Sequence, residues 1–386
     1  MQLQLYKKEL AITLNRHPDP KVPLFPPLFI PSSFPLTKKE RRLSEHSKEK
    51  KRKMIPSNIK TLISETYKKA VANGAIKFTE TVSTQLKDPK TKVPYLVSYA
   101  PSLALKPKRD NTEENQSTAD PFANPEKELT VLSDLTGDGS YQLLLNKYPI
   151  IPEHALLVTK DYQSQTSALS PKELKMAYDV LVQLDSDAEQ QQHLMFYNSG
   201  PASGSSQDHK HLQVFPLPPQ FEPFQTSLCS NTHHFIPDQR TEPLQNPEVS
   251  FAHFALPLPE SPEDVDEDLL AMSYFALLQR ALSFFQDWLG EHPDLKRSYN
   301  FLMTKKWLCV VPRSHESANI KEQEEKEERD GKFDVDINSA GYAGLLLVKS
   351  QESYDALLED PAVIDKLMLA CGFANTAGVK PGESDY

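Results

Sequence analysis

The sequence predicts an α+β fold in which helices pack on a mainly antiparallel sheet, built as two related halves. Short apolar runs are separated by Gly and Pro turns, which is typical of antiparallel strands, and a few longer segments carry apolar residues at helical spacing. A weak internal similarity supports the two halves. At 386 residues with 38% hydrophobic residues, the chain is long enough for two domains.

The predicted helices are recognised by their apolar spacing and their ends. Pro56 and Gly74 flank the first helical segment, Ser170 and Pro171 open the second, and an acidic turn opens the third. The predicted helices span residues 55–72, 170–184, 264–289 and 356–369.

The predicted strands are short apolar or alternating runs between turn residues. They span residues 76–80, 95–98, 129–132, 141–146, 155–159, 193–197, 209–214, 249–256, 299–311 and 344–348. Residues 109–125 form a polar loop, and residues 316–332 a charged excursion that we expect in solvent.

The internal similarity relates residues 141–147 to residues 299–305, since both begin with Tyr and end with Lys after an apolar run. In addition, Asn198-Ser-Gly resembles Asn338-Ser-Ala-Gly. Chance matching of apolar strands is the alternative, because so degenerate a repeat carries little information. The predicted division is an extension (1–53), a catalytic half (54–225) and a C-terminal half (226–386) that completes a cleft.

Charge is unevenly spread along the chain. Residues 1–53 hold 13 Lys or Arg against 5 Asp or Glu and are rich in Pro, whereas the remainder holds 30 against 48. We predict a disordered basic extension, with a nuclear localisation signal at 48–53 or organelle targeting as alternatives. The acidic body excludes broad nucleic-acid binding. No apolar run is long enough to span a membrane, so we predict a cytoplasmic or nuclear protein.

The cysteines argue against a disulfide scaffold. There are three, Cys229, Cys309 and Cys371, and no two form a CxxC pair. This pattern fits a reducing compartment and disfavours a thiolate zinc site.

The most informative stretch is NSGPASGSSQDHKHLQVF, residues 198–215. Alternation along a strand would place His209, His211 and Gln213 on one face, next to a loop of small residues. A neutral imidazole attacks phosphorus without prior deprotonation, and the backbone N–H groups of Gly204, Ser205 and Ser206 can bind phosphate oxygens. The stretch therefore predicts a centre for phosphate chemistry.

Two other interpretations of this stretch remain open from spacing alone. His-x-His on a strand is also a metal-ligand geometry, although no third ligand is evident, and it can be purely structural. A serine hydrolase is disfavoured, because Gly200-Pro-Ala-Ser203-Gly204 is not a G-x-S-x-G elbow.

The same stretch resembles the signature of the histidine triad superfamily, and within it the fungal diadenosine tetraphosphate phosphorylases, also called ATP adenylyltransferases. YQLLLNKYPIIPEHALLVTK, SFAHFALPLPE and NFLMTKKWLCVVPR are similar to the same family, so the resemblance covers about residues 54–386. It implies a fold of the histidine-triad or galactose-1-phosphate uridylyltransferase type.

The resemblance also implies a reaction. His211 would attack the α-phosphate of diadenosine tetraphosphate, ATP would depart, and orthophosphate would take AMP from the imidazole to give ADP. Gln213 stands where related hydrolases carry a third His, which favours transfer to phosphate over water, and His209 would orient the centre.

Adenylylsulfate phosphorolysis is an implied side activity. The rivals are a dinucleoside polyphosphate hydrolase, another nucleotidyltransferase, or a nucleotide sensor without catalysis.

The implied substrate contacts come from both halves. Leu345 stands where the family typically has Met, which weakens that assignment. The implied binding residues are Lys106, Asn146, Lys147, Asn198, Gly204, Ser205, Ser206, Gln213, Thr304, Leu345 and Lys349. The expected ligands are small nucleotides and orthophosphate, and a Mg-type divalent cation would be carried by the nucleotide. We expect no organic cofactor and no metal site formed by the protein. We also expect a monomeric chain.

Overall fold

A computed structural model describes residues 55–101, 120–185, 191–238, 241–291, 296–321 and 333–378. The predicted extension of residues 1–53 lies outside these ranges, as does Lys106. Among the described helices, none is both long and apolar enough to cross a lipid bilayer.

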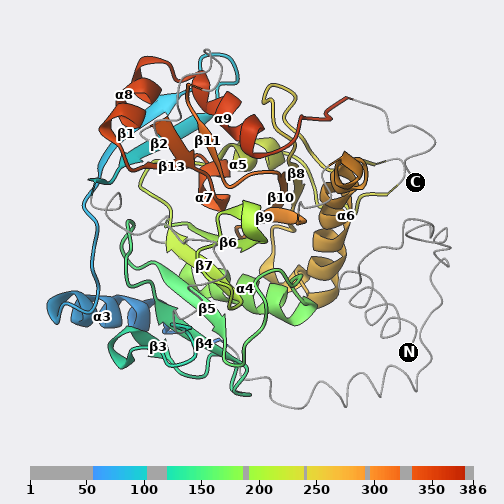
Figure 1. The fold of residues 1–386 in the computed structure, drawn as a ribbon. Helices are drawn as coiled ribbons and strands as arrows, with labels where there is room; N and C mark the ends of the chain where they lie inside the picture. Colours follow the sequence, from blue (N-terminus) through green and yellow to red (C-terminus); the bar gives the residue numbers. More distant parts are fainter. Residues whose placement is uncertain are drawn as a thin grey trace, which may run out of the picture. The chain divides into compact units, whose positions relative to one another are not determined.

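The centre of the fold is an eight-stranded sheet in which each strand pairs antiparallel with its neighbours (Figure 1). The predicted mainly antiparallel α+β fold is thus confirmed. In spatial order the strands are β3 (Thr130–Leu132), β4 (Tyr141–Leu145), β5 (Ala155–Thr159), β7 (His211–Pro216), β6 (His193–Ser199), β9 (Ser298–Met303), β10 (Trp307–Arg313) and β8 (Phe254–Pro257).

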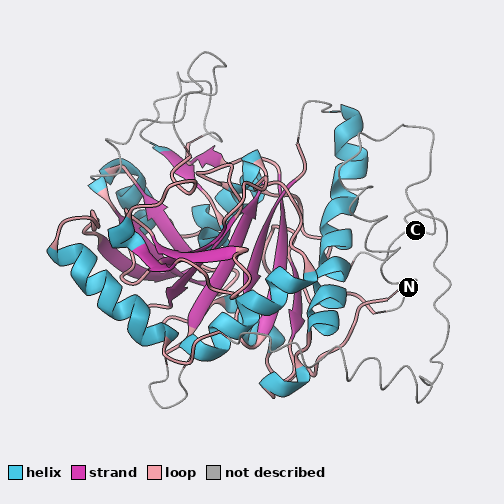
Figure 2. Ribbon diagram, turned by 90° about the horizontal axis from the view of Figure 1, so that it is seen from below, coloured by secondary structure: helices cyan, strands magenta, loops and turns pink. Residues whose placement is uncertain are grey.

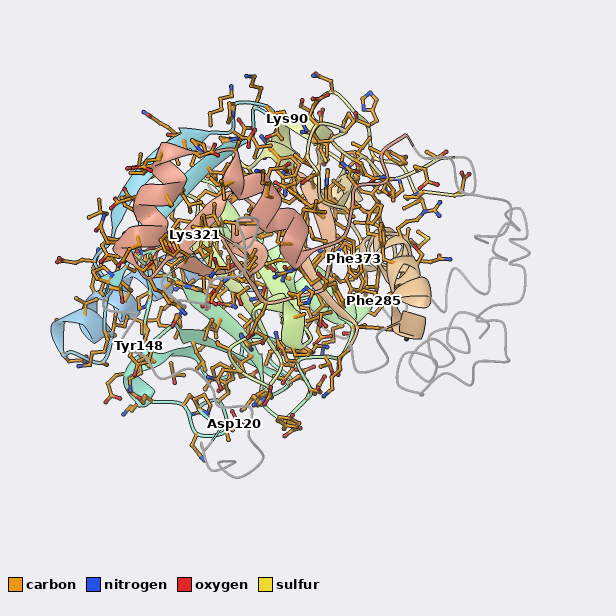
Figure 3. All side chains as sticks on the ribbon, turned by 45° about the horizontal axis from the view of Figure 1, so that its top comes forward. Lys90, Asp120, Tyr148, Phe285, Lys321 and Phe373 are labelled. Carbon is orange, nitrogen blue, oxygen red and sulfur yellow. The ribbon has the colours of Figure 1, made fainter. Side chains whose placement is uncertain are left out.

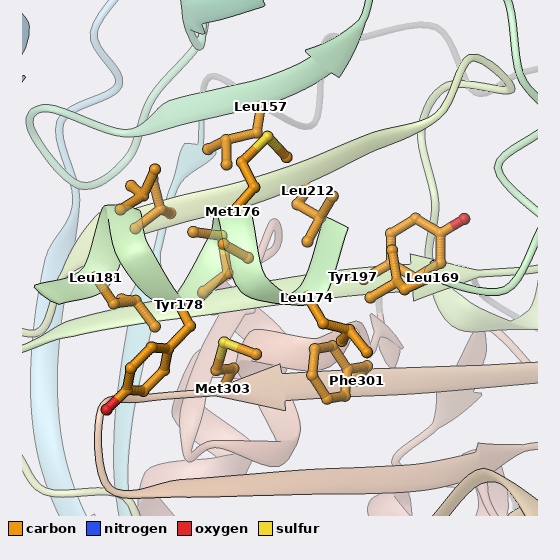
Figure 4. Close-up of a cluster of buried hydrophobic side chains, with 14 of the residues drawn as sticks. Leu157, Leu169, Leu174, Met176, Tyr178, Leu181, Tyr197, Leu212, Phe301 and Met303 are labelled. Carbon is orange, nitrogen blue, oxygen red and sulfur yellow. The ribbon is translucent and has the colours of Figure 1, made fainter. Parts of the chain in front are cut away.

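One face of this sheet is covered by the helices α3 (Ile59–Ala72), α4 (Pro171–Leu184) and α6 (Glu267–Glu291). The second of these begins with a capping box, in which the side chains of Ser170 and Glu173 each bond the other's backbone N–H. Figure 4 shows side chains of α4, such as Leu174 and Met176, in one cluster with Leu212 and Phe301 of the strands. Figure 2 shows the helices (cyan) and the strands of the sheet (magenta) from a second direction.

A second layer packs on the opposite face around Leu194, Phe215, Leu302 and Trp307. It contains one parallel pair of strands, β2 with β13. Its elements are β1 (Val82–Lys87), β2 (Pro94–Tyr99), β13 (Leu345–Val348), α5 (Phe224–Cys229), α7 (Ser339–Tyr342), α8 (Gln351–Glu359), α9 (Val363–Cys371) and the hairpin β11 (Ser317–Asn319) with β12 (Asp334–Asp336).

The two halves are related by strand order. In the first half the chain runs β5–α4–β6–β7, and its strands lie side by side in the order β5-β7-β6. In the second half the chain runs β8–α6–β9–β10, and its strands lie in the order β9-β10-β8, which is the first order reversed. The two units meet antiparallel at β6 and β9, as a two-fold arrangement requires. The predicted repeat was therefore right in kind but wrong in register, because it paired residues 141–147 of the outer β4 with the central β9.

The connection between the last two strands differs between the halves. Residues 200–210 join β6 to β7, whereas residues 304–306 join β9 to β10 in a tight turn closed by the Thr304 N–H on the Trp307 carbonyl (3.0 Å). Where β7 begins with His211, β10 begins with Trp307, which is 1% exposed and donates its indole N–H to Thr226. The small-residue loop therefore occurs in the first half alone.

Several predicted boundaries were wrong for local reasons. Residues 76–80 are not a strand, because the N–H groups of Lys77 and Thr79 bond loop carbonyls, and the real strand is β1. The tight turn divides 299–311 into two strands, and Pro361 follows the end of α8 and separates it from α9. The predicted strand 249–256 is reduced to β8, preceded by an isolated bridge at Phe251.

Candidate active site

The candidate site forms at the start of β7, on the face of the sheet opposite α4. His211 and Gln213 lie opposite Val158 and Leu156 of the neighbouring β5, and Gln213 also lies opposite Phe196 of β6. Lys210 points to the other face, where it pairs with Glu173. The predicted alternation is confirmed for residues 211–214, which lie in β7, whereas His209 precedes the strand and forms an isolated bridge with Ser164.

His211 is held in the form that a nucleophile needs. Its Nδ1 lies 2.8 Å from the backbone carbonyl of His209, which can only accept, so the ring proton sits on Nδ1 and leaves the lone pair on Nε2. The side chain is 3% exposed. Burial lowers the pKa of His211 to about 4, which keeps the imidazole neutral at physiological pH.

Gln165 fixes the backbone of His211. Its Oε1 accepts from the His211 N–H (2.8 Å), and its Nε2 donates to the carbonyl of Asn198 (2.8 Å). Gln165 thus ties the start of β7 to the end of β6. Its sequence position in a loop before α4 gave no signal of this role.

His209 uses both ring nitrogens within the protein. Nδ1 lies 2.7 Å from a carboxylate oxygen of Asp120, and Nε2 lies 3.0 Å from the hydroxyl of Thr159. The rings of Phe122 and Tyr162 flank it at centroid distances of 5.8 and 5.4 Å. Figure 3 labels Asp120 at the end of the chain segment that leads toward β3. A metal ion would have to displace one of these partners.

No group of three His, Cys, Asp or Glu side chains suited to a metal ion occurs in the described ranges. Both ring nitrogens of His209 bond oxygens of the protein, and Nδ1 of His211 bonds a backbone carbonyl. These bonds favour the phosphoryl interpretation of His-x-His over a metal-ligand pair.

Asp120 is a site residue that the sequence did not indicate, and its carboxylate gives a testable role. We expect Asp120→Asn to lower kcat about 10-fold, because an amide at this position holds the imidazole of His209 in one orientation less firmly. Steady-state kinetics beside the matched variant Asp134→Asn, whose carboxylate caps the exposed turn at Gly137, would measure this effect. Equal kcat in the two variants would contradict the role.

Gln213 is oriented by a chain of hydrogen bonds that begins at a backbone donor. The Tyr148 N–H bonds Oδ1 of Asn146 (3.0 Å), so the amide nitrogen of Asn146 faces Nδ1 of His154 (3.1 Å) and donates to it. His154 must then carry its proton on Nε2 and donate it to Oε1 of Gln213 (3.1 Å). The amide NH2 of Gln213 is consequently turned away from His154 and remains a donor for a substrate.

His154 is suited to this neutral form. It is partly exposed, yet its ring packs against Phe215 at 5.3 Å and Phe196 at 6.2 Å. Burial in this aromatic setting, together with the nearby His211, lowers the pKa of His154. The structure thus places Asn146, which the resemblance assigned to the nucleotide, on His154.

The small-residue loop lies directly against backbone of the second half. Gly200 and Gly204 have φ angles of +86° and +77°, which favour glycine. A Cβ on Gly200 would lie 2.4 Å from the Ser298 hydroxyl, and one on Gly204 would lie 2.8 Å from the Ile337 carbonyl. Side chains at either position would push the loop away from the second half.

Asn198 joins this loop to the second half. Its Oδ1 accepts from the amide of Asn300 (2.9 Å) and from both the N–H (3.0 Å) and hydroxyl (2.6 Å) of Ser339. Three donors on one oxygen fix the side-chain amide, so its NH2 group points away from them. Asn198 therefore lies near the end of β6, just before the loop that holds Gly204–Ser206, and its side chain bonds residues of the second half.

The other predicted contacts are made by Lys147, Thr304, Leu345 and Lys349. Thr304 is four residues beyond Asn300, about 13 Å further along β9 from the Asn198 end. Lys147 is paired with Glu126 (2.5 Å). Lys349 directly follows β13, the strand that begins with Leu345, and is paired with Asp336 of β12. Direct nucleotide contacts by these residues remain predictions.

Comparisons with known proteins identify the family of this chain. A family model described as the Ap4A phosphorylase N-terminal domain matches residues 49–229, and one described as the ATP adenylyltransferase C-terminal domain matches residues 247–374. The Saccharomyces cerevisiae protein APA1 is 51% identical over 334 residues, covering 86% of this chain and 99% of APA1. This chain belongs to the Ap4A phosphorylase family.

Two further comparisons extend over the same Ap4A phosphorylase region. Diadenosine 5',5'''-P1,P4-tetraphosphate phosphorylase 2 of Saccharomyces cerevisiae is 52% identical over 337 residues, covering 86% of this chain and all of the relative. The crystal structure of yeast Ap4A phosphorylase Apa2 has a TM-score of 0.75 at 51% identity, covering 86% of this chain and 100% of that chain. Apa2 in complex with Ap4A has a TM-score of 0.73 at 50% identity, covering 84% and 100%. The predicted family is confirmed.

Proposed function

We propose that this chain catalyses the phosphorolysis of diadenosine 5',5'''-tetraphosphate by orthophosphate to ADP and ATP. The observation that carries the proposal is the buried neutral His211, whose Nδ1 is held by the His209 carbonyl and whose Nε2 therefore keeps its lone pair. Family membership and relatives named for Ap4A phosphorylase activity support the same reaction.

The proposed reaction has two in-line steps. Nε2 of His211 attacks the α-phosphorus, the bond to the bridging oxygen breaks, and ATP leaves with the electron pair. An oxygen of orthophosphate then attacks the same phosphorus, the P–N bond breaks, and ADP leaves while Nε2 regains its lone pair. Neither leaving group needs a proton, which suits Gln213, because an amide can donate a hydrogen bond without acting as an acid.

The proposed ligands are small nucleotides and orthophosphate, with adenylylsulfate as a further substrate. A Mg-type divalent cation would arrive on the polyphosphate as part of the substrate, where it neutralises the charge of the oxygens. Because one chain supplies both halves of the sheet, we propose a monomer as the active unit.

The deciding experiment uses orthophosphate labelled with ³²P. The proposal expects the label in ADP and an equal amount of unlabelled ATP, and no turnover when phosphate is omitted. Formation of AMP at a rate independent of phosphate would identify a hydrolase instead. Binding of the dinucleotide without any turnover would identify a sensor.

The lowered pKa of His211 predicts the acid limb of the pH profile. Protonation removes the lone pair on Nε2, so activity is lost as pH falls through the pKa of about 4. We expect kcat/KM to stay constant from pH 7 down to about 5 and to fall below that. Circular dichroism at each pH separates unfolding from titration. A folded enzyme that loses half its activity near pH 6.5 would contradict this prediction.

A further inference from the structure

We propose that Arg313 of the second half is a positioning residue that sets the direction of the hydrogen-bond donors at the phosphate loop. It acts through Asn300 on the side chain of Asn198, and through the Ser203 carbonyl on the Ser203–Gly204 peptide. This inference rests on the proposed function, because it concerns how the same site holds phosphate oxygens.

Arg313 is an unusual side chain because it is 0% exposed and its described partners are uncharged oxygens. Nε donates to the carbonyl of Cys371 (3.0 Å), and Nη2 donates to the carbonyls of His315 (2.7 Å) and Ile337 (2.8 Å). The guanidinium carbon lies 4.9 Å from the centre of the Tyr342 ring. So many bonds hold the guanidinium plane in one orientation.

The remaining nitrogen of Arg313 fixes Asn300. Nη1 lies 2.5 Å from the Oδ1 of Asn300, and a guanidinium can only donate, so this end of the Asn300 amide must be the oxygen. The amide nitrogen of Asn300 therefore faces Asn198 and donates to its Oδ1 (2.9 Å). The NH2 of Asn198 is left on the opposite side as a donor.

The loop backbone is set in the same way. The carbonyl of Ser203 accepts from the amide nitrogen of Asn300 (2.9 Å) and more weakly from Nη1 of Arg313 (3.4 Å). In a trans peptide the C=O and the following N–H point in opposite directions, so the Gly204 N–H points away from Arg313. The Ile337 carbonyl that Arg313 holds is also the atom that a Cβ on Gly204 would strike.

One arginine thus determines the polarity of two donors that the sequence assigned to phosphate. Neither Arg313 nor Asn300 needs to touch the nucleotide. A buried network of this kind specifies orientation because each reversal would place two acceptors or two donors face to face. The second half has a tight turn where the first has the small-residue loop, and it contributes orientation to the first half.

The test is Asn300→Asp, which preserves size and can still accept from Arg313 but cannot donate to Asn198 or Ser203. We expect kcat/KM to fall about 100-fold, mainly through kcat, since oriented donors act most strongly on the developing charge. AMP affinity measured by calorimetry should fall much less. The matched control is Asn375→Asp, because Asn375 also donates to two carbonyls, those of Asn246 (2.8 Å) and Val249 (2.7 Å), and should leave kcat unchanged.

Each outcome decides something different. If Asn300→Asp does not fold, Asn300→Ala removes the same two donors without adding a charge and carries the same expectation. A folded variant whose kcat/KM is within threefold of wild type would overturn the role of Arg313 and Asn300 while leaving phosphorolysis intact. If the wild-type protein neither releases labelled ADP nor binds AMP, the proposed function fails, and the inference fails with it.

Discussion

Replacing His211 with Asn should lower kcat for phosphorolysis by at least about a thousandfold, because the lone pair on Nε2 is the attacking group and no neighbouring side chain can take its place. The variant should also fail to retain AMP covalently. Incubation with Ap4A in the absence of orthophosphate, followed by acid-free mass spectrometry of the intact chain, would show the AMP adduct on wild type alone.

The matched control for this variant is His253→Asn in the second half. His253 is also buried, its Nδ1 also donates to the carbonyl two residues earlier (3.0 Å), and burial likewise lowers its pKa to about 4. His253→Asn should lose stability but still form the adduct. An adduct that persists in His211→Asn would move the nucleophile to another residue.

Breaking the buried ion pair beneath the nucleophile should have the largest effect on stability. Lys210 and Glu173 are both 2% exposed at the side chain, and Nζ lies 2.8 Å from the carboxylate. We expect Lys210→Met to lower the free energy of unfolding by about 3–5 kcal/mol, because it leaves a buried carboxylate without its partner. Denaturant titration followed by tryptophan fluorescence would measure the change.

The double variant Lys210→Met with Glu173→Gln separates charge from packing. The amide of Gln can still accept from the Ser170 N–H at the start of α4, so the cap is kept (2.7 Å in the wild type) while the unpaired charge is removed. Stability should recover by at least about 2 kcal/mol relative to the single variant. If the double variant is no more stable than Lys210→Met, the loss comes from packing.

The sequence predicted the parts of the site that depend on short-range pattern. Alternation placed His211 and Gln213 together because a strand has a two-residue period, and the motif also led to the family. It did not predict Asp120, Gln165 or Arg313. Asp120 is 89 residues from its partner His209, Gln165 is 46 residues from His211, and Arg313 is 110 residues from Ser203. No local periodicity encodes contacts between residues so far apart in the sequence.

The repeat was assigned in the wrong register for a related reason. Apolar strands from different places in a sheet look alike, so the similarity of residues 141–147 to 299–305 reflected composition. Strand order decides the equivalence, and it is a property of tertiary pairing. The antiparallel course of β9 carries Thr304 to the far end of β6 from Asn198, so a nucleotide contact by Thr304 stays a prediction.

The tight turn between β9 and β10 determines how many AMP groups we expect one chain to carry. A symmetric pair of identical repeats would carry two centres, one on each side of the seam between β6 and β9. Here the second strand start is occupied by Trp307, so the described part of the second half has no counterpart of His211 at this position. Saturating adenylylation should therefore stop at one AMP per chain, and no cooperativity can arise between sites within it.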